Sequence, residues 1–121
     1  MNNNNTYFTK EIFSKDIDLE TNDDVLERIY GDNVKPTDKL SVEFWFLTDT
    51  EIKAIVFKDV LIKTYPEYLE IKVEEYDGDY EISGITNPLR MNLETINNWN
   101  IKMWDIGYIY DCKLDGWQVG T

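Results

Sequence analysis

The side chains in this sequence that could carry chemistry are almost all carboxylates. The chain holds 24 aspartates and glutamates, 12 lysines and arginines, one cysteine and no histidine. Without histidine, Ser-His-Asp and Cys-His catalysis, histidine ligation of zinc and the usual proton shuttle near neutral pH are excluded. Cys112 has one basic neighbour, Lys113, and no histidine to activate it, so we expect a buried or incidental thiol.

Two acidic pairs flank one predicted turn. Glu74 and Glu75 precede it, and Asp77 and Asp79 surround Gly78. Carboxylates beside a turn are usually solvated, and this run lacks the ligand spacing and final glutamate of a calcium loop. The glycines are scattered singly, without a phosphate-binding pattern. We therefore predict no metal site, no cofactor and no catalytic residue, while a hydrolase using two distant acids stays open as a minor alternative.

The charge balance is the strongest global signal. The net charge is −12 over 121 residues. A field of this sign repels phosphate backbones and anionic membranes and speeds encounter with a basic protein surface, until salt screens it. Solubility alone is the alternative explanation. We predict a basic protein partner, no direct contact with nucleic acid and no membrane contact.

The elements that must position these acids fit one domain. We expect residues 1–21 to form an N-terminal extension that is partly disordered, because its asparagine run is polar, and residues 22–121 to form a single domain. The extension has no secretory signal pattern, no later stretch is long enough to span a membrane, and a lone cysteine forms no internal disulfide. The expected location is the cytoplasm.

Local patterns predict six elements after a short first helix. That helix covers residues 23–30, with Asn22 as its cap and Gly31 as its stop. A strand over residues 40–47 leads into a helix that begins at the Thr48 to Glu51 capping box and ends near Thr64, before a proline. Because the stretch 54–62 is apolar on most sides, a buried strand is the competing interpretation there.

The second half of the chain is more regular. Residues 69–74 alternate between apolar and charged, Asp77-Gly78 is a hairpin signal, and residues 80–85 form the returning strand. Asn92 caps a last helix, and a short edge strand covers 114–119. The resulting βαββαβ order predicts an α+β, ferredoxin-like sandwich, with two helices on one face of a four-stranded antiparallel sheet.

Tryptophans among acids are typical of protein-binding surfaces, since aromatic side chains anchor an interface while charges at its rim steer the partner. Trp45 lies on the opposite strand face from Phe44 and Phe46, and we expect the first helix to cover it. Six residues are our candidates for partner binding: Asp111, Asp115, Trp117, Trp104, Glu74 and Asp77.

Two segments resemble the regulator of ribonuclease activity B family. One is the closing stretch from Gly107 to Trp117, with its Asp115-Gly116-Trp117 end. The other combines Asn22 to Glu27 with the Val42-Glu43-Phe44-Trp45-Phe46 strand, and the similarity spans residues 22–121. The resemblance implies a ferredoxin-like, non-catalytic domain that acts on ribonuclease E by binding it.

Beside the minor hydrolase alternative, two non-catalytic functions therefore remain open from the sequence. The first is a regulator or inhibitor of a ribonuclease that acts by protein-protein contact. The second is an immunity protein that neutralises a toxin nuclease, for which small size, acidity and missing catalytic groups serve equally well.

Overall fold

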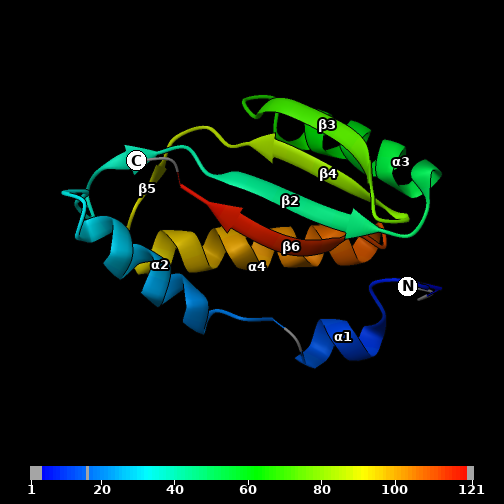
Figure 1. Cartoon of the computed structure of the whole chain (residues 1–121), viewed down its shortest axis with the longest axis horizontal. Helices are drawn as coiled ribbons and strands as arrows, with labels where there is room; N and C mark the ends of the chain where they lie inside the picture. Colours follow the sequence, from blue (N-terminus) through cyan, green and yellow to red (C-terminus); the bar gives the residue numbers. More distant parts are fainter. Residues whose placement is uncertain (1–3, 16, 120–121) are drawn as a thin grey trace.

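The computed structural model describes residues 4–15 and 17–119, and its elements follow the predicted order, with additions at the N-terminus and at residues 89–90 (Figure 1). In chain order the elements are α1 (Lys10–Lys15), α2 (Glu20–Tyr30), β1 (Lys39–Leu40), β2 (Glu43–Thr48), α3 (Glu51–Thr64), β3 (Leu69–Tyr76), β4 (Asp79–Ile85), β5 (Leu89–Arg90), α4 (Leu93–Ile109) and β6 (Lys113–Gln118).

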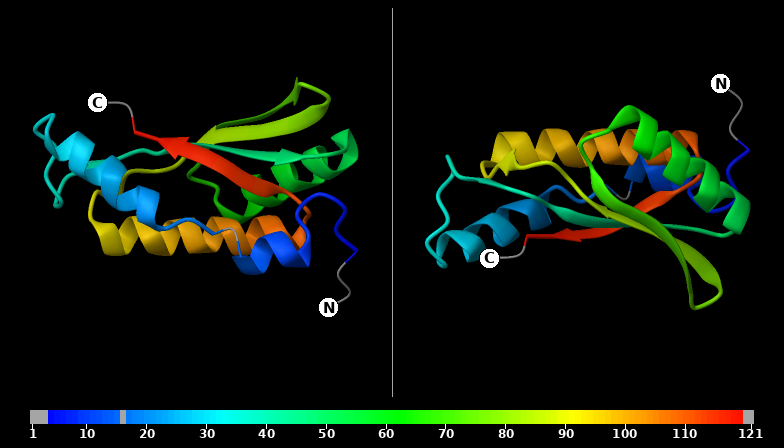
Figure 2. Two further views of the ribbon diagram at one scale, coloured as in Figure 1. Left: turned by 60° about the horizontal axis from the view of Figure 1, so that its bottom comes forward. Right: turned by 90° about the horizontal axis from the view of Figure 1, so that it is seen from above.

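The main sheet has four strands in the order β3-β4-β2-β6, and every neighbouring pair is antiparallel. Helices α3 and α4 lie together on one face of this sheet, and the opposite face is open (Figure 2). Strands β1 and β5 form a separate two-stranded ribbon. This arrangement confirms the predicted ferredoxin-like sandwich.

The core lies between the sheet and the two helices. Alternation along β2 sends Phe44 and Phe46 inward, where both are fully buried, and leaves the residues between them on the open face. The predicted strand over 40–47 is interrupted after Leu40, because β1 pairs with β5 and not with the main sheet. Core residues from the covering helices include Phe57 and Leu61 of α3 and Ile96, Trp99 and Met103 of α4.

Helix α3 is a helix over its whole length, so the competing strand interpretation was wrong. Its cap is Thr50, whose hydroxyl accepts a hydrogen bond from the backbone N–H of Lys53 at 3.3 Å. Thr48, the predicted cap, ends β2 instead, and its buried hydroxyl donates to the Asp111 carbonyl at 2.7 Å. Asn92 caps α4 as predicted, by accepting from the backbone N–H of Thr95 at 2.8 Å.

The β3–β4 connection is the predicted two-residue hairpin. Asp77 has φ 53° and Gly78 has φ 91°. Two consecutive residues with positive φ match the twist of antiparallel strands, which is why this dipeptide favours such a turn. The hairpin projects the end of β3 and β4 beyond the helices (Figure 2).

The first helix differs from its prediction. It begins at Glu20, so Asn22 lies inside α2 and is buried. Its amide donates to Asn97 and Asn100 of α4, and its carbonyl oxygen accepts from the Trp117 indole. Asn22 therefore bonds to residues that are distant in the sequence and does not cap the helix, although its local sequence had indicated a cap.

Part of the N-terminal extension packs against the rest of the domain. Phe8 is fully buried, and its ring packs edge-on against Trp104 with ring centroids 4.6 Å apart. The following residues form α1, which lies beside α4 (Figure 1). The part of the asparagine run in residues 1–3 lies outside the described residues.

Candidate functional site

Two of the candidate residues make structural contacts within the chain. Asp111 is 5% exposed and accepts hydrogen bonds from the backbone N–H groups of Thr6, Tyr7 and Phe8 and from Lys53 Nζ at 2.6 Å. Burial raises the pKa of Asp111, but the bonds from Lys53 and the three N–H groups outweigh it and lower that pKa below its ordinary value. The Trp104 side chain is buried beneath Phe8.

Trp104, Trp117 and Asp115 come together at one edge of the sheet. They line a depression of about 220 Å³ between α2, α4 and β6. Both indole N–H groups have partners already: that of Trp104 donates to the Phe13 carbonyl at 3.0 Å, and that of Trp117 donates to Asn22. Asp115 is exposed, so it is the group at this edge most available to a partner.

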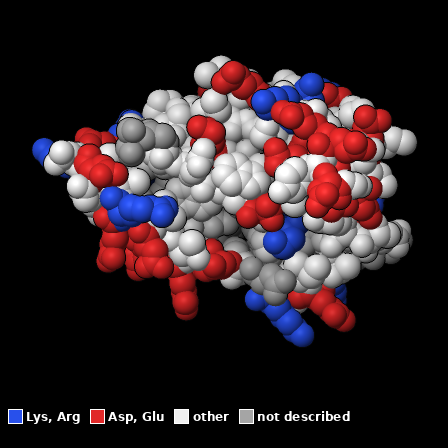
Figure 3. Space-filling view, in the orientation of Figure 1, with Lys and Arg blue, Asp and Glu red and all other residues white. Residues whose placement is uncertain are grey.

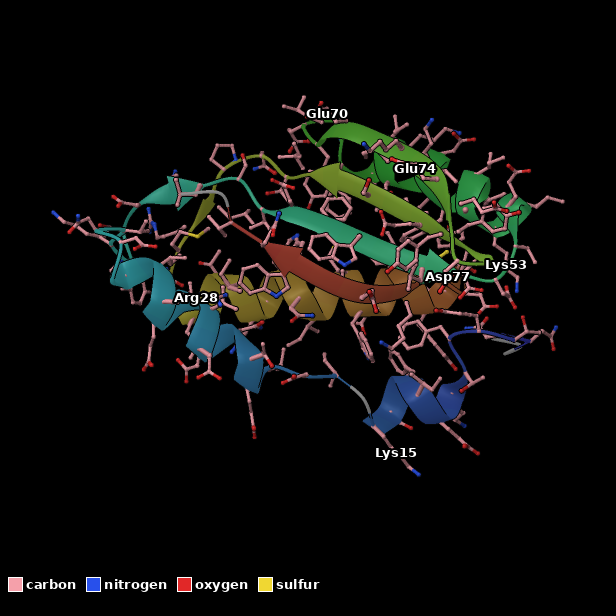
Figure 4. The ribbon with its side chains drawn as sticks, viewed as in Figure 1. Lys15, Arg28, Lys53, Glu70, Glu74 and Asp77 are labelled. Atoms are coloured by element: carbon pink, nitrogen blue, oxygen red, sulfur yellow. The ribbon has the colours of Figure 1, made fainter. Side chains whose placement is uncertain are left out.

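Glu74 and Asp77 lie elsewhere, on the β3–β4 hairpin, where both are exposed (Figure 4). Glu74 belongs to the open face of the sheet, together with acids that sequence reasoning did not select. We define the acidic face as the open-face residues Glu43, Trp45, Glu70, Glu74 and Glu81, which line one shallow depression of about 440 Å³.

The register of the strands explains how this face is built. Trp45 of β2 lies opposite Ser83 of β4 on one side and Gly116 of β6 on the other. A Cβ at Gly116 would lie 2.9 Å from the Trp45 ring, so glycine is needed there for the indole to lie across β6. Trp45 is therefore half-buried by its own sheet and not covered by α2, which differs from the prediction.

Like charges face each other on the same surface. Glu74 of β3 and Glu81 of β4 are direct cross-strand partners. Such a pair is destabilising by up to about 1 kcal/mol, so it works against folding. Lys72 is the nearest counter-charge, and its Nζ lies 3.2 Å from Glu74 with both side chains well exposed, which makes this ion pair weak.

Glu70 occupies an irregular position at the rim of the acidic face. A register shift between Leu69 and Lys72 marks a β-bulge, and Glu70 has φ 53°. This left-handed conformation costs a residue other than glycine about 1 kcal/mol or more. A bulge of this kind re-aims side chains and is frequent next to functional sites.

Few of the acids are neutralised. Within residues 4–15 and 17–119, ion pairs link Lys53 to Asp49 and Asp111, and Lys72 to Glu74. Figure 3 shows red side chains gathered over β3 and β4, with pale surface beside them, and a second acidic group over α2. The acidic face thus combines largely unpaired negative charge with a half-buried tryptophan.

The described residues offer little for catalysis. They contain no group of three His, Cys, Asp or Glu residues that could hold a metal ion. Burial raises the pKa of Cys112 to about 12, so its side chain stays a thiol. For Asp49, burial raises the pKa, but hydrogen bonds from Thr6 and Lys53 lower it below its ordinary value, the opposite of what a general acid needs.

Comparison with known families supports the first of the two functions that the sequence left open. The model of the family described as Regulator of ribonuclease activity B matches residues 19–119. The chain belongs to this family. Regulator of ribonuclease activity B is a family of regulatory proteins and is not known for catalysis. The matched range contains every strand of the acidic face.

Two negative findings complete the description. A search of curated proteins gave no match. Among the described residues, no helix has both the length and the apolar character needed to cross a membrane.

Proposed function

We propose that this protein regulates a ribonuclease by binding it directly, and that the acidic face is the surface that contacts a basic segment of the enzyme. The observation that carries the proposal is the Glu74–Glu81 cross-strand pair near half-buried Trp45. Like charges placed opposite each other oppose folding, and a cationic partner would relieve their repulsion.

The chemistry of the face fits an extended or helical segment rich in arginine and lysine. Glu43, Glu70 and Glu81 lack ion pairs within the described part of the chain, so they are available to guanidinium or ammonium groups. Arginine can also stack on the Trp45 ring while pairing with a neighbouring glutamate. Regulation would follow from occupying a basic segment that the ribonuclease uses to hold RNA.

The test is the affinity for purified ribonuclease E, the partner that the family resemblance implies, measured by calorimetry at about 50 mM salt. We expect the double substitution Glu74→Gln/Glu81→Gln to weaken binding about tenfold, because two steering and pairing charges are lost. The matched control is Glu20→Gln/Glu27→Gln, which makes the same charge change at exposed positions of α2. We expect the control to keep at least half of the affinity.

Glu70→Gly separates binding from stability. Glycine adopts the left-handed conformation of residue 70 without strain, so the free energy of unfolding should stay constant or rise. Affinity for the ribonuclease should fall, because an acid of the acidic face is lost. If the two double variants weakened binding equally, a diffuse field would explain the binding and the acidic face would not. Absence of any binding at low salt would overturn the proposed function itself.

A further inference from the structure

Helix α3 carries an apolar stripe on the side that faces away from the sheet. Exposed fractions are 76% for Ile52, 47% for Ile55, 47% for Val56 and 46% for Ile62. At about 100° per residue these positions fall on one side of the helix, opposite buried Phe57. Helix α3 is therefore apolar on both faces, and only one face is used within the chain.

The charges around this stripe differ from those of the rest of the molecule. Helix α3 contains three lysines and two acids, a net of +1, whereas the whole chain has a net charge of −12. Copies of such an acidic protein repel one another at most orientations. Two copies that approach through the outward side of α3 therefore repel each other less than they do in other orientations.

We infer that the α3 stripe is the contact surface for a second copy of this chain, with the two α3 helices packed antiparallel across a two-fold axis. An axis at the level of Phe57 places Ile52 of one copy opposite Ile62 of the other. The same register places Glu51 opposite Lys63. Because the axis repeats each contact, the dimer gains two apolar pairs and two pairs of opposite charge.

The size of the stripe sets the strength of this dimer. A helix of 14 residues is about 21 Å long, and one of its faces buries roughly 400 Å² per copy. Stable interfaces bury roughly 800 Å² per partner, so the expected dimer is weak, with a dissociation constant on the order of 100 µM.

Asp59 lies at the centre of the stripe and limits the affinity further. In the antiparallel register it faces Ile55 of the second copy, and Lys63 lies one turn along its own helix. Removing this acid should tighten the dimer, while adding an acid at Ile55 should abolish it. These opposite effects come from residues that are both exposed, so the fold should tolerate either change.

Sedimentation equilibrium on the full chain, from about 10 µM to 1 mM protein, tests the inference. The weight-average mass should rise from the monomer toward twice that value. Raising salt from about 50 to 500 mM should strengthen association severalfold, because it screens repulsion between the acidic copies. The same salt change should weaken ribonuclease binding through the acidic face, so failure of one proposal is distinguishable from failure of the other.

Variants then test the geometry. Ile55→Glu should weaken association at least tenfold, Asp59→Ala should tighten it about tenfold, and Ile101→Glu, the same type of change on exposed α4 surface, should leave it unchanged.

A charge exchange tests the antiparallel register directly. Glu51→Lys and Lys63→Glu should each weaken association, and the double variant should restore it, with circular dichroism confirming that each variant is folded. A chain that stays monomeric at 1 mM and high salt overturns the inference, as does a double variant that is weaker than both single variants.

Discussion

The Asp111 carboxylate holds the N-terminal segment against the body of the domain, so its neutralisation should release that segment. The carboxylate accepts from the backbone N–H of Thr6 at 3.0 Å, of Tyr7 at 3.1 Å and of Phe8 at 2.6 Å, and it pairs with Lys53. Asp111 has φ 60°, a conformation that asparagine also tolerates. Asp111→Asn therefore removes the charge without adding backbone strain.

The expected loss of stability depends on the number and kind of hydrogen bonds that an asparagine amide at position 111 cannot make. A hydrogen bond to a charged group contributes about 1.5 to 3 kcal/mol, and several around one carboxylate are not additive. The Lys53 side chain is 30% exposed, so water hydrates its ammonium group when Asp111 is neutralised. The ion pair with Lys53 therefore contributes less to stability than a fully buried pair would. We expect Asp111→Asn to lower the free energy of unfolding by about 3 kcal/mol.

Asp49→Asn is the matched control. Asp49 also pairs with Lys53, at 2.9 Å, but both side chains are 30% exposed, and its hydrogen bond from the Thr6 hydroxyl can be accepted by an asparagine oxygen as well. An exposed pair of this kind contributes about 0 to 1 kcal/mol. The control should therefore remain close to the unmodified protein in urea unfolding followed by circular dichroism.

Hydrogen exchange locates the effect. In Asp111→Asn, the amides of residues 4–15 should exchange much faster. The exchange rates of amides in β2 and β4 should rise only as much as the lower free energy of global unfolding requires. Equal costs for the two substitutions, or unchanged exchange over residues 4–15, would refute the idea that the carboxylate holds this segment.

The stability that the Asp111 carboxylate contributes depends on pH in a definite direction. The folded pKa of Asp111 is lowered, so the carboxylate contributes its full stability above the unfolded value of about 3.9. That contribution is lost as pH falls through the folded pKa. The difference in unfolding free energy between the unmodified protein and Asp111→Asn should therefore be constant near neutral pH and shrink below about pH 4.

Two further substitutions test buried contacts made by helix α4 and by Trp117. Gly107→Ala should lower the free energy of unfolding by about 2 to 3 kcal/mol in urea titrations, because the added Cβ would lie 2.1 Å from the Cys112 carbonyl oxygen. Asn22→Ala should cost about 2 to 3 kcal/mol, since it leaves the Trp117 indole N–H without its partner, whereas Asp23→Ala at the exposed neighbouring position should change stability by less than about 0.5 kcal/mol.

Much of the fold was predictable because its signals are local. Alternation along β2 and β3, the Asp77-Gly78 turn and the Asn92 cap each depend on residues within a few positions of one another. The order of these elements was then enough to give the correct sandwich, since few topologies satisfy it.

The errors arose where a distant residue competes for a side chain. Asn22 and Thr48 have the right chemistry for caps, but buried partners in α4 and at Asp111 take their hydrogen bonds. The N-terminal segment is ordered by Asp111, more than 100 positions away along the chain. Nothing in the local composition of residues 4–8 shows that such a partner exists.

The candidate site was predictable only in part, for the same reason. Glu74 was selected as an acid near the hairpin, and Trp45 was recognised as lying off the core face. The pairing of Trp45 with Gly116, and that of Glu74 with Glu81, depend on strand order and register, which only the tertiary structure gives. Knowledge of the register would have been enough to find the acidic face.

The two proposed surfaces lie on opposite sides of the sandwich, and this has a consequence for regulation. Helix α3 covers one face of the sheet, and the acidic face is the other (Figure 2). A dimer formed through α3 would leave both acidic faces open and directed away from each other. Two such faces can engage two basic segments of one ribonuclease, or two ribonuclease molecules, and linked binding raises the effective affinity without new contacts. Ile55→Glu should then weaken capture of a ribonuclease with two basic segments while leaving the affinity for a single segment unchanged.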